Sequence, residues 1–304
     1  MRQILACACL LLLLGCAKKT ETGVSVDPAF ARLVPSGATL LAGFRVDKIE
    51  ATPLYQKYGG TLKLAALSEF SSRTGLDPSK DISSLLVAYD GKQSMAFARG
   101  HFSEAAIKRK LASYGARPTT YKGYTLFGTD RGVILFIKPD LAVAGSGDAL
   151  QTFVDDRDRH DSGIPADLED RLKALPTVDQ VYVVSSTGIP LSAFPSRSDV
   201  QSALSNIVEF INGLTFGLAV DEGVHLSAQI DCISDAGAKR VDDAFRGAIG
   251  LARLATKDNQ LDLLRLYDAV QVDQQQSSVR IHADISGDLF GKLLEAYPRL
   301  RDQQ

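Results

Sequence analysis

The sequence predicts an α+β protein made of two similar halves, and three observations support this prediction. Two segments, 86–109 and 217–240, align without a gap at a constant offset of 131 residues, which takes Leu86 to Gly217. Within them, apolar and polar residues alternate with the period of two that is typical of a half-buried antiparallel strand. The segments on either side also repeat, with slightly different offsets. We therefore expect a duplicated architecture.

Each aligned segment predicts a strand, a tight turn, a second strand and then a helix. The alternation is clearest in the second copy, where Val224, Leu226, Ala228 and Ile230 face one way and His225, Ser227, Gln229 and Asp231 face the other. Ser103 and Ser234 are favourable N-caps for the two helices, and an acidic residue follows each of them. Cys232 continues the apolar face, so we expect it to be buried as a small apolar residue.

The flanking segments complete the pattern. Short β-rich runs at 39–46 and 181–186 each precede a proline-marked turn and a helical stretch. The first helix is expected to begin at Pro53 after the cap Thr52, and the second at Ser198 with an apolar stripe of Val200, Leu204, Ile207, Val208 and Ile211. Each half ends in a strand, a Ser-Gly-Asp turn (146–148 and 286–288) and a helix. Extra strands are predicted at 121–127 and 133–138 in the first half, and an added helix in the second half, where 247–255 and 261–269 both have a helical pattern.

Taken together, each half has the order β-α-β-β-α-β with a terminal helix, which is the split-βαβ pattern of ferredoxin-like folds. We predict two tandem, elaborated ferredoxin-like repeats with antiparallel sheets. The most polar stretch, 155–164, marks the boundary, which gives a first repeat at 28–160 and a second at 161–304. The alternative is that such matches arise by chance in an α+β chain.

The N-terminus has the layout of a cleavable secretory signal. Arg2 supplies a positive charge, and the apolar run from Ile4 to Leu14 is shorter than the roughly 20 residues of a membrane-spanning helix. The end of this run, Leu13-Leu14-Gly15-Cys16, resembles the lipobox of bacterial lipoproteins. By that resemblance, residues 1–15 are removed after Gly15, and Cys16 becomes the first mature residue, with lipid on its sulfur and an acyl chain such as palmitate on its amine. The alternative is an ordinary signal peptide or short anchor in which Cys16 is incidental.

The same resemblance implies a location. The residue after Cys16 is Ala17 rather than aspartate, which in lipoproteins of diderm bacteria favours the outer membrane, with the protein facing the periplasm. Several acyl chains on one residue would anchor stably, because a single chain binds a membrane only marginally. Residues 16–27 are small and polar, so we expect a flexible lipidated tether.

Composition excludes some functions. The chain has 34 basic and 36 acidic residues, and losing Arg2 with the signal changes the formal net charge from −2 to −3. Such a balance argues against a nucleic-acid partner, because proteins that bind nucleic acids usually carry a strong excess of basic residues. Of the four cysteines, Cys7 and Cys9 leave with the signal and Cys16 carries lipid, so Cys232 has no partner for an internal disulfide.

No motif predicts a catalytic site, a metal site or a cofactor. In the acidic cluster 155–161, Arg157 and Arg159 neutralise the carboxylates, so we favour a solvated linker or helix end over a calcium loop. The turn 145–148 lacks the third glycine of a dinucleotide site and the lysine of a phosphate loop, so we favour a capping turn. His225 and His282 lie on the polar faces of their strands and form a weak candidate surface.

A second resemblance concerns the start of the mature chain. The segment 34–43, followed by Thr52-Pro53-Leu54-Tyr55, resembles uncharacterised secreted bacterial proteins. It implies an envelope setting and a duplicated architecture. Our first hypothesis is a lipid-anchored, non-enzymatic envelope module, bound to the membrane through its lipid, with an envelope protein or polymer as partner. The alternative is a hydrolase or small-ligand-binding protein with a site between the two repeats.

Overall fold

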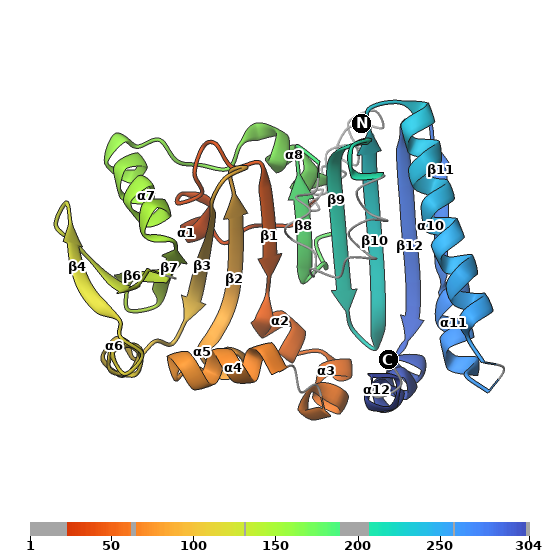
Figure 1. Ribbon diagram of the computed structural model, residues 1–304, viewed down its shortest axis with the longest axis horizontal. Coiled ribbons are helices and arrows are strands. Elements are labelled where there is room, and N and C mark those ends of the chain that lie inside the picture. The colour runs from red at the N-terminus through yellow and green to blue at the C-terminus, as the bar shows by residue number, and fades with distance from the viewer. Residues whose placement is uncertain (1–22, 62–64, 131, 189–206, 258, 302–304) are drawn as a thin grey trace, which may run out of the picture.

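The computed structural model describes residues 23–61, 65–130, 132–188, 207–257 and 259–301. Its strands form one antiparallel sheet, in the order β11-β12-β10-β9-β8-β1-β2-β3-β7-β6-β5-β4, and Figure 1 shows them side by side. The strands are β1 (Leu40–Phe44), β2 (Ile82–Tyr89), β3 (Ser94–Gly100), β4 (Arg117–Tyr121), β5 (Tyr124–Thr129), β6 (Gly132–Lys138), β7 (Leu141–Gly145), β8 (Val181–Ser185), β9 (Ile211–Val220), β10 (Gly223–Cys232), β11 (Val270–Gln275) and β12 (Ser278–Ser286). The prediction of an α+β protein with antiparallel strands is confirmed.

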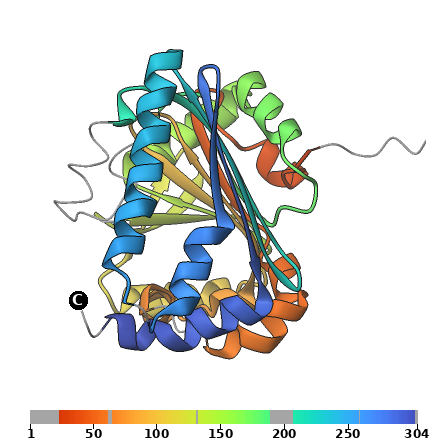
Figure 2. The same cartoon turned by 90° about the vertical axis from the view of Figure 1, so that its right-hand side faces the viewer.

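The helices lie on both faces and along one end of the sheet (Figures 1 and 2). They are α1 (Pro28–Ala31), α2 (Val46–Glu50), α3 (Pro53–Tyr58), α4 (Ala65–Thr74), α5 (Pro78–Asp81), α6 (Glu104–Ala112), α7 (Gly147–Arg159), α8 (Ala166–Ala174), α10 (Asp235–Ala255), α11 (Leu261–Ala269) and α12 (Gly287–Arg301), with a short 3₁₀ turn at Gly59–Thr61. Figure 2 shows α10 on one side of the sheet, and α1 and α8 on the other.

The two halves meet in the middle of this sheet through β1 and β8. The pair is antiparallel, and its register is nearly self-complementary: Leu40 lies opposite Ser185, and Phe44 lies opposite Val181. Going outwards, β1 is followed by β2, β3, β7 and β6, and β8 is followed by β9, β10, β12 and β11. Each half therefore has the same internal strand order, and β4 and β5 extend the first half. This is the arrangement that a two-fold symmetric pair of units would have.

The predicted ferredoxin-like units are not confirmed. A split-βαβ unit places a third strand between two parallel strands. Here the long connection 45–81 joins β1 and β2, which are direct antiparallel neighbours. The order of elements along the chain is close to the prediction. However, the connection 45–81 leads into a neighbouring strand that runs antiparallel to β1 rather than parallel to it.

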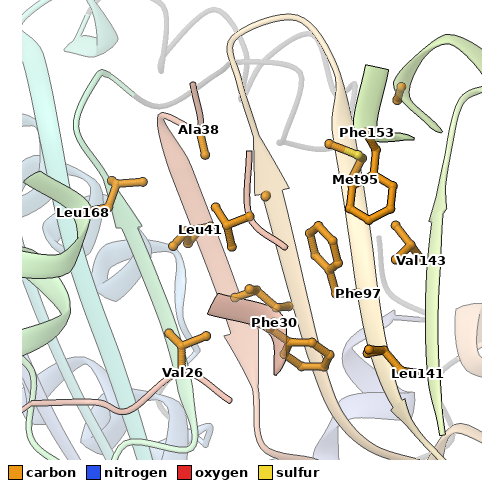
Figure 3. Close-up of a cluster of buried hydrophobic side chains, with 14 of the residues drawn as sticks. Val26, Phe30, Ala38, Leu41, Met95, Phe97, Leu141, Val143, Phe153 and Leu168 are labelled. Carbon is orange, nitrogen blue, oxygen red and sulfur yellow. The ribbon is translucent and has the colours of Figure 1, made fainter. Parts of the chain in front are cut away.

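The larger core lies on one face of the sheet, under α1, α7 and α8. Phe97 of β3 is fully buried, and its ring lies 6.3 Å from that of Phe30 in α1 and 6.0 Å from that of Phe153 in α7. Figure 3 shows these rings beside Leu41 and Val143. Such tilted and edge-on ring pairs add to the stabilisation from burial itself.

A second core lies on the opposite face of the second half, under α10. Ile230 of β10 and Val279 of β12 pack with Ala238 and Val241 of this helix. Cys232 belongs to the same cluster and is 5% exposed, which confirms the prediction that it is buried. Ser234 caps α10 by accepting a hydrogen bond from the backbone N–H of Gly237 at 3.1 Å. Ser103 occupies the N-cap of α6 without a side-chain hydrogen bond.

Other local predictions have mixed outcomes. The helix at Pro53 with its cap Thr52 is confirmed, as are the strand at 133–138 and the helix at 261–269. The predicted strand 121–127 contains the turn between β4 and β5, and the run 247–255 is the second part of α10. The expected helix opening at Ser198 lies mostly outside the described residues, and Ile211 begins β9 instead of ending that helix. The polar stretch 155–164 begins inside α7, and His160, the residue that caps its C-terminus, has the left-handed conformation (φ 58°).

The end of the predicted tether is part of the packed protein. Val24 and Val26 are 6% and 8% exposed and belong to the larger core. The N–H of Val24 donates to the carbonyl of Leu172 at 2.9 Å, and Asp27 caps α1. The polar residues around the two valines concealed their burial in the sequence. Elsewhere, none of the helices in the described ranges has the length and apolar character needed to cross a membrane.

Candidate functional site

The two histidines singled out in the sequence lie on neighbouring strands. A row of directly paired residues crosses the middle of the sheet, and it consists of Gly43, Tyr182, Gly217, Ser227 and His282. Directly paired residues of antiparallel strands point to the same face. His225 lies two residues before Ser227 and therefore shares that face. We call this surface of β10 and β12 the polar face; it continues the face that carries the larger core in the first half.

His225 is held between two carboxylates. Its Nδ1 lies 2.7 Å from Oδ1 of Asp284, the residue directly opposite on β12, and its Nε2 lies 3.2 Å from Oδ1 of Asp221. An imidazole satisfies two carboxylates only when both nitrogens carry a proton. The hydrogen bond to Asp284, and secondarily the one to Asp221, raises the pKa of His225 against the opposing effect of burial. The geometry therefore favours the imidazolium form.

Asp284 and Asp221 are held in their charged forms. Asp284 also contacts Nε2 of His282 at 2.8 Å, and its hydrogen bonds with His225 and His282 lower its pKa. Asp221 lies in the β9–β10 turn, where its Oδ1 accepts the N–H of Gly223 at 2.9 Å. That backbone hydrogen bond is the main cause of the lowered pKa of Asp221. His225, His282, Asp221 and Asp284 thus form one hydrogen-bonded network.

A pocket of about 340 Å³ lies beside this cluster. Its walls come from the loop before β8, the end of β9, the start of β10 and β12: Pro176, Val178, Asp179, Gln180, Ala219, Val220, Asp221, His225, Leu226, Ser227 and His282. The volume lies at the lower end of the range for small-molecule sites, which combine an apolar lining with a few polar groups. Every lining residue belongs to the predicted second repeat, so the pocket does not lie between the two halves.

Asp179 is the most deeply buried charged residue of the pocket, with 3% of its surface exposed. Its Oδ2 is buried and has no hydrogen-bond partner among the described residues. The carboxylate packs against Gly217 of β9, where any side-chain carbon would overlap Oδ2. Burial raises the pKa of Asp179, and the nearby Arg45 opposes that rise.

Arg45 lies next to Asp179 but does not bind its carboxylate. Its Nη2 donates to the backbone carbonyls of Thr177 (2.8 Å) and Asp179. It thereby ties the loop before β8 to the end of β1. On its other side lies a smaller pocket of about 200 Å³, which is also lined by Tyr182. Burial raises the pKa of Tyr182 to about 12.

Among the described residues of this pocket, no nucleophile is paired with a base. Ser227 lines the pocket directly opposite His282, yet no hydrogen bond joins it to either imidazole in the described part of the chain. A serine nucleophile requires such a contact with a base that can accept its proton. His225 has both nitrogens directed at carboxylates, and Cys232 is buried against the opposite face with its pKa raised by burial. Within the described ranges, no three His, Cys, Asp or Glu residues are arranged to hold a metal ion.

The remaining sequence candidates lie elsewhere. Gly15 and Cys16 are outside the described residues. His101 follows β3 and His160 follows α7, so neither joins the cluster. Ser146 caps α7 through the N–H of Ala149 at 3.1 Å, as expected of a capping turn.

Sequence reasoning missed Asp179, Asp221 and Asp284 as members of the site. Because side chains alternate along a strand, Asp284 shares a face with His282, and the pairing of β10 with β12 places it directly opposite His225. Asp179 lies in a loop, and its burial depends on Gly217, which is distant in the sequence. No local pattern marks it.

The comparisons with known proteins add a remote structural likeness. No protein-family description matches the chain, and no curated protein matches it. Three solved structures of the protein TP0453, described as its crystal forms I, III and IV, share 14%, 13% and 13% sequence identity with it. They cover 90%, 90% and 89% of this chain and 98%, 99% and 97% of their own, with TM-scores of 0.47, 0.49 and 0.47.

Proposed function

We propose that this protein is a lipid-anchored module of the bacterial cell envelope that binds a partner without transforming it. The anchor is supported by the sequence Leu13-Leu14-Gly15-Cys16 after a short apolar run. The same residues, with Ala17 after the cysteine, support the outer membrane as its location and the periplasm as the compartment that it faces. The partner is an envelope protein or polymer.

One observation carries the choice of binding over catalysis. The pocket beside β9 is lined by His225, which is held between Asp221 and Asp284. An imidazolium that donates from both nitrogens cannot act as a general base. The same network gives the pocket a fixed pattern of charge and hydrogen-bonding groups, which is what specific recognition requires.

The internal repeat belongs to this proposal. We infer that the two halves derive from one ancestral unit that paired with a second copy of itself through its first strand. The near-symmetric register of β1 with β8 and the equal strand order of the two halves support this. The polar face then represents a surface that only the second half has developed, because helices cover the equivalent face of the first half.

Site-specific photo-crosslinking tests the binding function. Val178 lies at the pocket and is 63% exposed, so we would replace it with p-benzoylphenylalanine. Leu254 of α10 is 85% exposed on the opposite side of the sheet and provides the matched control. We expect a discrete adduct with an envelope component from Val178 and none of the same mass from Leu254. Equal patterns from both sites would reject the pocket as the binding site.

A further inference from the structure

The pocket beside β9 carries a negative charge that the described residues leave without a partner. Asp179 is 3% exposed, and its Oδ2 accepts no hydrogen bond from any described group. A buried carboxylate without a donor is costly, because it loses its hydration and gains no replacement. Gly217 provides the room that this carboxylate occupies. The fold thus maintains an acidic group beside the pocket at the expense of stability.

The other charged groups around the pocket do not remove this excess. Arg45 is the neighbouring cation, but its Nη2 donates to the carbonyls of Thr177 and Asp179, not to the carboxylate. The imidazole of His225 is shared between Asp221 and Asp284. No lysine or arginine is among the residues that line the pocket. A bound group that brings a positive charge and several N–H donors would complement this site.

The rest of the lining sets the shape of such a group. Pro176, Val178, Ala219 and Leu226 give the pocket apolar walls. A hydrated metal ion would find little to coordinate there, whereas a short alkyl chain would remove apolar surface from water. The combination of apolar walls and one buried carboxylate fits an amphipathic cation.

We propose that this pocket binds an alkylammonium group, with the ammonium donating hydrogen bonds to the carboxylate of Asp179 and the alkyl chain against the apolar walls. This inference rests on the proposed binding function and names the ligand chemistry of the same site. The group can come from a free amine or from a lysine side chain of an envelope protein. An incoming ammonium favours the charged form of the carboxyl and so opposes the rise in its pKa that burial causes.

Titration of the purified full chain with n-butylamine tests the proposal, with binding followed by calorimetry at neutral pH. The neutral probe n-butanol has the same length and lacks the charge. A peptide, acetyl-Gly-Lys-Gly-amide, distinguishes a lysine side chain from a free amine. We expect butylammonium to bind at least about tenfold more tightly than butanol, since hydrogen bonds to a charged group contribute about 1.5–3 kcal/mol. Equal affinity for the two probes would overturn the proposal.

The matched variants are Asp179→Asn and Asp243→Asn. Asp243 is an exposed residue of α10 that pairs with Lys239, so its replacement keeps the same change of charge far from the pocket. We expect Asp179→Asn to weaken butylammonium binding by about tenfold or more and Asp243→Asn to leave it unchanged. Unchanged binding in Asp179→Asn would contradict the proposal.

A measurement on the unaltered chain covers the case in which Asp179→Asn does not fold. In NMR spectra, butylammonium should shift the backbone amides of Asp179, Gly217 and Ala219, and butanol should not. Shifts confined to other surfaces would reject the site. A Val178 crosslink that persists while neither amine probe binds would retain the binding function and reject the ammonium chemistry alone.

Discussion

At the scale of single residues, His225 shows how the fold converts a predicted surface residue into a fixed charge. The alternation of β10 placed it on the polar face, which the sequence predicts without difficulty. Its two carboxylate partners come from the β9–β10 turn and from β12. α10, α11 and β11 separate β10 from β12 in the sequence, so no local pattern could predict the contact between His225 and Asp284. The burial of Asp179 is even harder to predict from the sequence, because it depends on a loop and on Gly217, which is distant in the sequence.

Replacing Asp284 with asparagine should lower the pKa of His225 towards its ordinary value, because the hydrogen bond with Asp284 is the main cause of the rise. An NMR titration of the imidazole resonances measures this, with Asp243→Asn as the control. An unchanged titration of His225 in Asp284→Asn would show that the carboxylate does not hold the imidazolium.

The same ion pairs predict a pH dependence of stability. A raised pKa in the folded protein means that His225 contributes fully below its unfolded pKa, and that this contribution is lost as the pH rises through the folded pKa. We expect a contribution below about 1 kcal/mol, because the side chain of His225 is 44% exposed and exposed pairs are screened. Urea unfolding across this pH range, compared between the unaltered chain and Asp284→Asn, measures it.

At the scale of elements, the central pair β1–β8 depends on a glycine. Gly43 lies opposite Tyr182, whose buried ring covers the position that a side chain at 43 would occupy. The sequence predicted both β-rich runs, since their apolar residues are local. It did not predict that they pair with each other, because the hydrophobic period of a strand does not specify its neighbour. The ferredoxin-like prediction failed at this same step: it assigned the right elements and the wrong neighbours.

Gly43→Ala should therefore destabilise the protein by about 1–3 kcal/mol, the usual cost of forcing a methyl group into a packed core. Gly37→Ala is the matched control, because nothing lies within 4 Å of the added carbon there. We expect the control to change the free energy of unfolding by less than about 1 kcal/mol. Urea unfolding of both variants measures the difference. Equal stability would show that Tyr182 moves aside freely and does not fix the pair.

At the scale of the whole molecule, one sheet joins two halves that have the same strand order but are covered by helices in different ways. The larger core lies on one face under α1, α7 and α8 and includes residues of both halves, and the second half has a further core on the opposite face under α10. This leaves the polar face of β10 and β12 outside both cores. The equal strand order of the two halves agrees with the repeat that the offset of the hairpins predicts. The additional core on the opposite face could not be predicted, because it depends on which face of the sheet α10 covers.

The proposed lipid anchor also belongs to this scale. Cys16→Ser should abolish incorporation of labelled palmitate and release the protein from the membrane fraction, because the sulfur is the proposed attachment point. Cys7→Ser is the control, since that cysteine lies inside the predicted signal. Palmitate labelling and membrane fractionation of both variants measure the effect. Retained labelling in Cys16→Ser would reject the lipobox interpretation.

The Val178 crosslink in intact cells tests the central claim most directly, because it examines anchor, pocket and binding together. The account predicts one adduct at Val178 and none of the same mass at Leu254. It also predicts that the partner within that adduct has the mass of the unmodified envelope component by mass spectrometry. The absence of any adduct specific to Val178, or a partner recovered only as a cleaved product, would contradict the assignment of this protein as a binding module.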